Sequence, residues 1–284
     1  MKIGFIGLGL MGAPLARRIV AANKDVLLYN RTASKIEAVA CVGKNAKAAK
    51  SFHDFKDCDL VFTCLALPQH VLAAVVEEGG IYECLPQGAI HVECSTIGTD
   101  TSRAIAESAK KKGMQYLQCT LNKSPVQAEK GETPLFLGGD KQAVDKIKDV
   151  LSLMGTIHYV GTQEQACAVK ILSNLMGMSN LAVLAEGIKL GDALGIDREK
   201  LLELLTVTGA HSFQMAVRGP WIAHKDYNPR FSVDLALKDI RLGYKMAQEV
   251  QYEPTLMADT MKRFEEAQKQ GLGQQDCAAV TDMK

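Results

Sequence analysis

Short apolar runs alternate with amphipathic stretches over the first half of the chain. The apolar runs predict strands at 2–6, 25–29, 59–64, 89–93, 114–118, 134–138 and 157–160. The stretches between them predict helices at 11–22, 34–39, 69–76, 100–112 and 140–153. Such alternation is typical of a largely parallel sheet that is covered by helices on both faces.

After Gly161 the pattern changes, and no further run has the character of a strand. From Gln163 to about Leu194 the chain lacks proline and is apolar almost all round. It predicts one helix of about 45 Å at 1.5 Å per residue. A helix so long and apolar is expected to be a buried connection between two domains. Further helices are predicted at 197–208, 212–223, 232–251 and 255–270.

The first predicted strand runs into three glycines, Gly7, Gly9 and Gly12, and then into a helix. In a dinucleotide site the first glycine permits the tight turn, the second lets the backbone approach a pyrophosphate, and the third lets helix and strand pack closely. The amides at the helix N-terminus add an anion site. We therefore predict a Rossmann-type α/β domain at residues 1–162 and an all-α domain at 163–284.

The second predicted strand ends in Asn30 and Arg31, and Thr32 and Lys35 follow closely. An NAD site usually carries an acidic residue here, which hydrogen-bonds the adenosine ribose. An acid would repel a 2′-phosphate, whereas an arginine binds one through charge-assisted paired hydrogen bonds. These residues favour NADP(H) over NAD(H). The alternative is that Arg31 is a solvated turn residue.

Composition excludes several other classes of protein. The 33 basic and 32 acidic residues nearly cancel, and no basic stripe indicates nucleic-acid binding. No apolar stretch approaches the roughly 20 residues of a membrane span. The eight cysteines are scattered and form no C-x-x-C pair. A secreted disulfide framework usually belongs to a much shorter chain, so reduced thiols are favoured. Neither histidines nor carboxylates have metal-ligand spacing. We expect a soluble, cytoplasmic protein that binds no membrane and no metal.

Lys170 is the most informative single residue of the second half. It lies among apolar residues of the long predicted helix, with Asn174 one turn later on the same face. Lysine is rarely buried unless it is paired or functional. The alternative is that Lys170 extends along the helix and places its amine in solvent.

The chain opens with Gly-Phe-Ile-Gly-Leu-Gly-Leu-Met-Gly at residues 4–12. This motif resembles the β-hydroxyacid dehydrogenase family, which includes 3-hydroxyisobutyrate dehydrogenase and the glyoxylate/succinic semialdehyde reductases. Further motifs of the family follow in its order: Ser95-Thr96, Lys170-x-x-x-Asn174, Phe231 with Lys238-Asp239, and Gly271-Leu272-Gly273-Gln274-Gln275-Asp276. Together the matches cover nearly the whole chain.

The resemblance implies that Lys170 is the catalytic acid/base, which protonates a carbonyl oxygen while NADPH gives a hydride to the carbon. Such chemistry needs a lysine pKa lowered from about 10.4 towards neutrality. Asn174 would orient the amine or the substrate hydroxyl. The resemblance and the glycine motif together imply these coenzyme contacts: Gly7, Leu8, Gly9, Leu10, Met11, Gly12, Asn30, Arg31, Thr32, Lys35, Leu65, Thr96 and Lys238. Ser95, Phe231 and Asp239 would border the substrate.

The substrate loop departs from the family pattern Asp-Ala-Pro-Val-Ser-Gly-Gly. Here Asn122 replaces the serine, and Lys123 and Ser124 replace the two glycines. These three residues could bind an anion through an amide, an ammonium and a hydroxyl. The alternative is that Lys123 points to solvent and Asn122 only forms a turn. We expect a small anionic aldehyde or hydroxy acid as substrate.

The leading function is NADPH-dependent reduction of an acidic semialdehyde or a glyoxylate-like compound, with alcohol oxidation in reverse. One alternative is an imine reductase, although those proteins usually lack the lysine found at position 170. Another is a catalytically silent NADP-binding sensor or scaffold, for which the altered substrate loop is the best argument. The long apolar helix makes a homodimer or homotetramer plausible.

Overall fold

The computed structural model describes residues 1–284 as two compact units, Met1–Lys170 and Ile171–Lys284. The division lies inside helix α8 (Gln163–Ala193), whereas the expected boundary preceded that helix at 162/163. The first two turns of α8 belong with the N-terminal unit because their residues Ala166 and Cys167 are buried there: the carbonyl of Ala166 accepts a hydrogen bond from Thr120, and Cys167 packs in its core.

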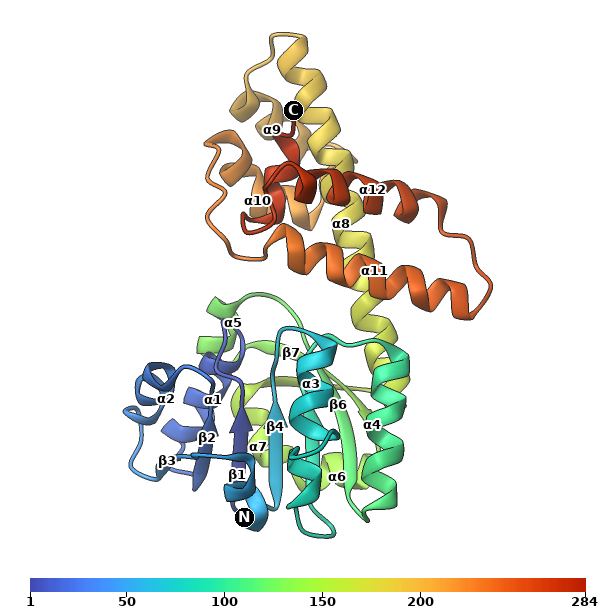
Figure 1. The fold of residues 1–284 in the computed structure, drawn as a ribbon. Helices are drawn as coiled ribbons and strands as arrows, with labels where there is room; N and C mark the ends of the chain where they lie inside the picture. Colours follow the sequence, from blue (N-terminus) through green and yellow to red (C-terminus); the bar gives the residue numbers. More distant parts are fainter. The chain divides into compact units, whose positions relative to one another are not determined.

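The N-terminal unit is built on one sheet of eight strands in the order β3-β2-β1-β4-β5-β6-β7-β8 (Figure 1). All neighbouring pairs are parallel except β6 with β7, which confirms the prediction of a largely parallel sheet. The strands are β1 (Ile3–Ile6), β2 (Val26–Tyr29), β3 (Ala46–Ala48), β4 (Leu60–Thr63), β5 (Ile90–Glu93), β6 (Gln115–Leu121), β7 (Thr133–Gly139) and β8 (Gly155–Gly161).

Both faces of the sheet are buried, because alternate residues of each strand enter different cores. Phe5 and Phe62 pack against the face covered by α1 (Gly12–Ala21), α2 (Ala33–Ala40), α5 (Pro125–Lys130), α6 (Lys141–Lys146) and α7 (Lys148–Met154). Ile6 and Val61 pack against the opposite face, which is covered by η1 (Phe52–Asp57), α3 (Pro68–Val75), η2 (Ile81–Glu83), α4 (Thr99–Lys111) and the start of α8.

The seven predicted strands are all present, but the short elements β3, α5, η1 and η2 of this unit were missed. Strand β3 has only three residues, Ala46–Ala48, at the edge of the sheet, and offers no apolar run. Helix α5 has six residues, and it begins at the capping box of Ser124 with Gln127. The predicted helix at 140–153 is two helices, α6 and α7, which meet at Ile147.

The C-terminal unit is helical, as predicted. After α8 come α9 (Arg198–Thr206), α10 (Phe213–Ala223), α11 (Val233–Glu249), α12 (Thr255–Lys269) and η3 (Cys277–Thr281). Its core is formed by apolar side chains from each of these elements, among them Ile171, Leu181 and Ile188 of α8 and Phe264 of α12. Arg198 joins the end of α8 to the C-terminus, because its guanidinium pairs with Asp192 and with Asp282, each at 2.6 Å.

The expectation that α8 is buried all round was wrong for the single chain. Met176, Val183 and Leu190 are 61%, 70% and 63% exposed, while the opposite side of the helix packs in the core. The expectation that no stretch could span a membrane also needs correction. By length and composition α8 qualifies, with a mean hydropathy of 1.4 over an 18-residue window of which 39% is buried. A core helix of a soluble protein passes the same test.

Candidate functional site

The order of the strands indicates a binding site at the carboxyl ends of the neighbouring strands β1 and β4. The chain proceeds from β1 outward through β2 to β3, then returns to the other side of β1 with β4. In open α/β sheets such a reversal leaves a crevice beyond the carboxyl ends of the two strands. The loops that leave β1 and β4 begin at Gly7 and Cys64, so both lie at this crevice.

The glycine loop after β1 has the geometry of a pyrophosphate cradle. Gly7 has φ +96°, and a Cβ there would lie 2.3 Å from the carbonyl oxygen of Cys64. A Cβ on Gly12 would lie 2.0 Å from the carbonyl oxygen of Gly7, so loop and helix α1 pack without room for a side chain. Gly9 is exposed, with nothing within 4 Å of its Cβ position. The loop fits a dinucleotide because backbone amides at the helix N-terminus are open to an anion.

Asn30 ties the end of β2 to this loop. Its side-chain oxygen accepts a hydrogen bond from the amide of Leu8 at 3.0 Å, and its side-chain nitrogen donates to the carbonyl of Thr32 at 3.0 Å. Arg31 and Thr32 are exposed at the same turn. The predicted residues at the end of β2 are therefore brought to the glycine loop, with Asn30 as a structural link and Arg31 at the surface.

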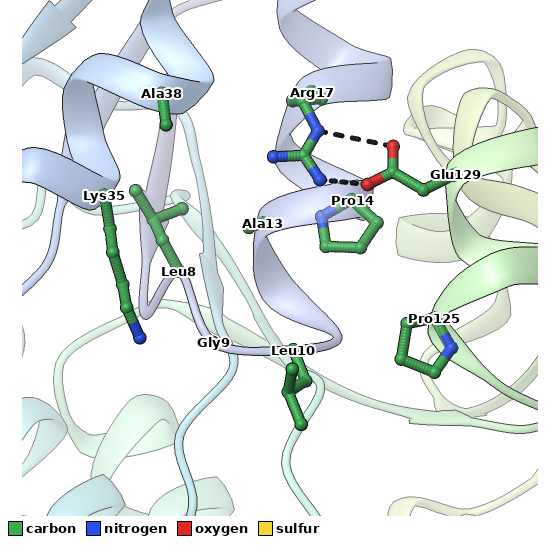
Figure 2. Close-up of a pocket in the computed structure, with 10 residues that line it drawn as sticks. All are labelled: Leu8, Gly9, Leu10, Ala13, Pro14, Arg17, Lys35, Ala38, Pro125 and Glu129. Atoms are coloured by element: carbon green, nitrogen blue, oxygen red, sulfur yellow. Dashed lines mark hydrogen bonds and ion pairs between the residues drawn. The ribbon is translucent and has the colours of Figure 1, made fainter. Parts of the chain in front are cut away.

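A cavity of about 360 Å³ lies beside the glycine loop (Figure 2). Lys35 of α2 borders it, as do Arg17 of α1 and Glu129 of α5, which form an ion pair with each other. That ion pair, absent from the sequence predictions, joins the glycine-loop helix to the helix after the predicted substrate loop. The lining residues are Leu8, Gly9, Leu10, Ala13, Pro14, Arg17, Lys35, Ala38, Pro125 and Glu129.

The loops after β4 and β5 are joined by Ser95. Its hydroxyl oxygen accepts a hydrogen bond from the amide of Leu65 at 2.7 Å, and only 3% of the residue is exposed. The hydroxyl predicted to border the substrate is thus engaged in holding the predicted coenzyme residue Leu65. The neighbouring Thr96 is half-buried.

Glu93 is a residue that the sequence analysis missed. It is fully buried at the end of β5, and burial raises the pKa of its carboxyl to about 7. One carboxyl oxygen accepts from the hydroxyl of Thr63 at 2.6 Å and the other from the amide of Ser95 at 2.6 Å. A carboxylate within an apolar strand, two residues before Ser95, was the signal available in the sequence.

The predicted substrate loop at 122–124 is a turn between β6 and α5. The side-chain nitrogen of Asn122 donates to the carbonyl of Pro134 at 3.3 Å, and Ser124 caps α5 with its hydroxyl 2.5 Å from the side-chain oxygen of Gln127. Lys123 is exposed and has φ +65°, a left-handed conformation that is uncommon outside glycine. Two of the three side chains are used locally, which leaves the ammonium of Lys123 for an anion.

In the C-terminal unit the predicted polar residues are in contact. The side-chain nitrogen of Asn174 donates to Asp239 at 2.6 Å, and the ammonium of Lys238 lies 2.7 Å from the other oxygen of Asp239. Asp239 is 2% exposed. This carboxylate fixes the orientation of the Asn174 amide.

Lys170 is half-buried on α8, one turn before Asn174 and on the same face of the helix. Phe231 begins the segment before α11, and its amide donates to the fully buried carboxylate of Asp276 at 3.0 Å. Asp276 also pairs with Arg218 at 3.2 Å. The closing Gly-Gln-Gln-Asp motif is therefore an anchor for the chain around Phe231.

Two sequence-family models match the chain. The NAD binding domain of 6-phosphogluconate dehydrogenase matches residues 2–166, and the NAD-binding domain of NADP-dependent 3-hydroxyisobutyrate dehydrogenase matches residues 165–283. Together they cover both units.

Curated relatives and solved structures agree with these matches. Glyoxylate/succinic semialdehyde reductase 2 of Arabidopsis thaliana is 29% identical over 99% of this chain and 79% of its own length. 2-(Hydroxymethyl)glutarate dehydrogenase of Eubacterium barkeri is 29% identical over 99% and 93%. The structure of 3-hydroxyisobutyrate dehydrogenase from Salmonella typhimurium has the same fold, with a TM-score of 0.91, 23% identity and full coverage of both chains. An imine reductase from Bacillus cereus is more distant, at 18% identity, 99% and 98% coverage and a TM-score of 0.63.

Proposed function

Because the chain belongs to the β-hydroxyacid dehydrogenase family of NAD(P)-dependent enzymes, we propose that it reduces a small acidic aldehyde with NADPH. The substrate class is a semialdehyde or a glyoxylate-like compound, and alcohol oxidation is the slower reverse reaction. The main support for the proposal is the open space next to the backbone of Gly9, where a pyrophosphate could bind. The same chain has Lys170 one helical turn before Asn174.

The choice of NADPH over NADH rests on the residues that follow β2. Asn30 is neutral and is occupied by its bonds to Leu8 and Thr32, so no carboxylate stands where a 2′-phosphate would bind. Arg31 is exposed beside it, and Lys35 borders the cavity next to the glycine loop. Two cations near one anionic group favour a phosphate over a ribose hydroxyl.

The coenzyme supplies the hydride when it is bound. Lys170 holds the proton that neutralises the developing alkoxide of the substrate and takes it back in the oxidation direction. Asn174 orients the substrate oxygen or the amine of Lys170, and its amide is held for that task by Asp239. Lys238 and Thr96 contact the coenzyme, and Phe231 borders the substrate, as the family resemblance implies.

Lys123 is proposed to bind the acidic group of the substrate. Its neighbours Asn122 and Ser124 use their side chains in local hydrogen bonds, so the ammonium of Lys123 is the charged donor that the turn presents. A carboxylate, sulfonate or phosphate would gain a charge-assisted hydrogen bond there.

A second copy of the chain is proposed to cover the exposed side of α8, in a cytoplasmic homodimer or homotetramer. Met176, Val183 and Leu190 recur every seven residues, so their exposed side chains form one apolar stripe along the helix. A symmetric oligomer would bury this stripe against its own copy.

The test is the loss of NADPH absorbance with a panel of small aldehydes, each acid matched by a neutral analogue, and a panel of cyclic imines. We expect turnover of the acidic aldehydes alone. Lys170→Ala is expected to bind NADPH but to lose at least about a hundredfold in kcat, the usual range for a general acid/base. Faster reduction of imines would favour an imine reductase, and no turnover with retained NADPH binding would favour a silent module.

A further inference from the structure

Four buried side chains form one line of hydrogen bonds beneath the candidate coenzyme site. The hydroxyl of Tyr82 lies 2.8 Å from Nδ1 of His91, and Nε2 of His91 lies 2.7 Å from the hydroxyl of Thr63. That hydroxyl lies 2.6 Å from Oε2 of Glu93. None of the four is more than 2% exposed. They come from η2, β4 and β5.

The direction of every bond follows from the charge of Glu93. Burial lowers the pKa of His91 to about 3, so its ring is neutral, with one nitrogen as donor and the other as acceptor. An ionised Glu93 can only accept, hence the hydroxyl of Thr63 donates to it. His91 then donates from Nε2 to Thr63, and Tyr82 donates to Nδ1.

A proton on Glu93 reverses the line. The carboxyl hydroxyl donates to Thr63, Thr63 donates to Nε2 of His91, and Nδ1 donates to the oxygen of Tyr82. One proton is added, from solvent to Glu93; the ring proton of His91 changes nitrogen, and the hydroxyls of Thr63 and Tyr82 rotate. All three hydrogen bonds persist, because hydroxyls and a neutral imidazole can each donate or accept.

The other carboxyl oxygen of Glu93 is linked by hydrogen bonds to the loops of the candidate coenzyme site. It accepts from the amide of Ser95 at 2.6 Å, and the hydroxyl of Ser95 accepts from the amide of Leu65 at 2.7 Å. Gln118 of β6 completes the frame, since its side-chain nitrogen donates to the carbonyls of Glu93 at 3.0 Å and Ser95 at 3.2 Å. Glu93 thus anchors the loops that follow both β4 and β5.

Burial has the largest effect on the pKa of Glu93, and hydrogen bonds from Ser95, Thr63 and Cys94 oppose it. The titratable groups that interact with it are His91, Tyr82, Tyr116 of β6, Cys64 after β4, Cys94 after β5 and Cys167 of α8. Burial raises the pKa of both phenols and, to about 12, those of the Cys64 and Cys167 thiols. With a pKa of about 7, Glu93 has both protonation states available near neutral pH.

We propose that Glu93 is a positioning residue of the coenzyme site, and that its hydrogen-bond line to Thr63, His91 and Tyr82 reverses direction when it takes up a proton. The reversal keeps the anchor of Ser95 and Leu65 in both protonation states. The inference rests on the proposed coenzyme site for its role, but not for its hydrogen-bond chemistry.

The ring nitrogens of His91 give the direct test, by NMR of protein with labelled histidine and with His91 assigned from His91→Phe. On the alkaline side of the pKa of Glu93 we expect the proton on Nε2, and on the acid side on Nδ1. Glu93→Gln mimics the protonated acid, since its amide nitrogen donates to Thr63 and its oxygen accepts from Ser95. It should show Nδ1–H at every pH. The matched control Thr63→Val should leave the His91 tautomer independent of pH, while the Ser95 amide proton still shifts.

NADPH titrations test the anchoring role. Glu93→Ala is expected to weaken binding at least fivefold, and Glu93→Gln to restore it to within twofold of the unmodified chain. A His91 tautomer that is constant with pH in the unmodified chain overturns the reversal. Binding by a folded Glu93→Ala protein as tight as by the unmodified chain overturns the anchor, as does a folded Glu93→Gln protein that binds more than fivefold weaker. If the unmodified chain does not bind NADPH but its His91 tautomer still reverses with pH, the proposed function fails and the reversal of the hydrogen bonds stands.

Discussion

Arg31 lies exposed at the turn after β2, next to a neutral Asn30 whose side chain is already hydrogen-bonded. Arg31→Ala should weaken NADPH binding at least about tenfold, because a hydrogen bond to a charged group contributes roughly 1.5–3 kcal/mol. NADH binding should hardly change. Fluorescence titration with both coenzymes measures the two affinities, with Lys111→Ala, an exposed lysine at the end of α4, as control. Equal losses for both coenzymes would refute the role given to Arg31.

Glu93 should also make stability depend on pH. Its pKa rises from 4.5 in the unfolded chain to about 7 in the folded one, so the folded state keeps this proton up to a higher pH. The free energy of unfolding should therefore fall as pH rises from about 4.5 to about 7, by roughly 3 kcal/mol at 1.36 kcal/mol per pKa unit. Urea unfolding of the unmodified chain and Glu93→Gln at both ends of this range isolates the contribution. Parallel curves for the two proteins would contradict it.

At the scale of single residues, the sequence predicted the glycine positions that backbone geometry requires. It missed the pKa shifts and contacts that arise only when side chains are buried together. The turn at Gly7, the open space at Gly9 and the close packing at Gly12 agree with the backbone geometry expected of them, because each follows from the absence of a Cβ. Glu93 was missed because its raised pKa and its contact with Thr63 arise only when β4 and β5 pair. The local bonds of Asn122 and Ser124 depend likewise on β7 and α5.

The turn from β6 into α5 has its own test. Lys123 has φ +65°, so Lys123→Gly should be as stable as the unmodified chain or more so, since glycine adopts this conformation without a Cβ clash. Lys123→Asn tolerates it too, and is the matched substitution that keeps a polar side chain. Both substitutions should raise KM for an acidic aldehyde at least about fivefold, because each removes the charged hydrogen bond to the acidic group of the substrate. The KM for the neutral analogue should stay constant. If both KM values are unchanged, Lys123 faces solvent.

Among the elements, long periodic segments were predicted well and short ones were not. The predicted helix at 212–223 is α10 (Phe213–Ala223), because a capping serine and apolar periodicity mark it. Strand β3 and helix α5 form because a neighbour supplies their partners: β2 pairs with β3, and the Arg17–Glu129 ion pair holds α5 against α1. Three to six residues carry too little pattern to reveal such elements.

For the whole molecule, the stripe on α8 predicts self-association. Val183→Glu places a charge at the middle of the stripe, between Met176 and Leu190, and should lower the mass measured by sedimentation to that of one chain. Val207→Glu, at an 86% exposed position after α9, is the matched control and should leave the mass unchanged. A Val183→Glu protein with the mass of the unmodified chain would show that this face does not join the copies.

The sequence by itself determined the α/β order, the largely parallel sheet, the glycine turn and the helical second half, because each depends on local periodicity or on one residue's backbone freedom. The tertiary structure decided which polar groups meet: Asn174 with Asp239, Glu93 with Thr63 and Ser95, and Arg17 with Glu129. It also decided that α8 buries one side and exposes the other, a division that an apolar sequence all round does not encode. These outcomes follow from contacts between segments far apart in the chain, where burial and pairing set both charge and orientation.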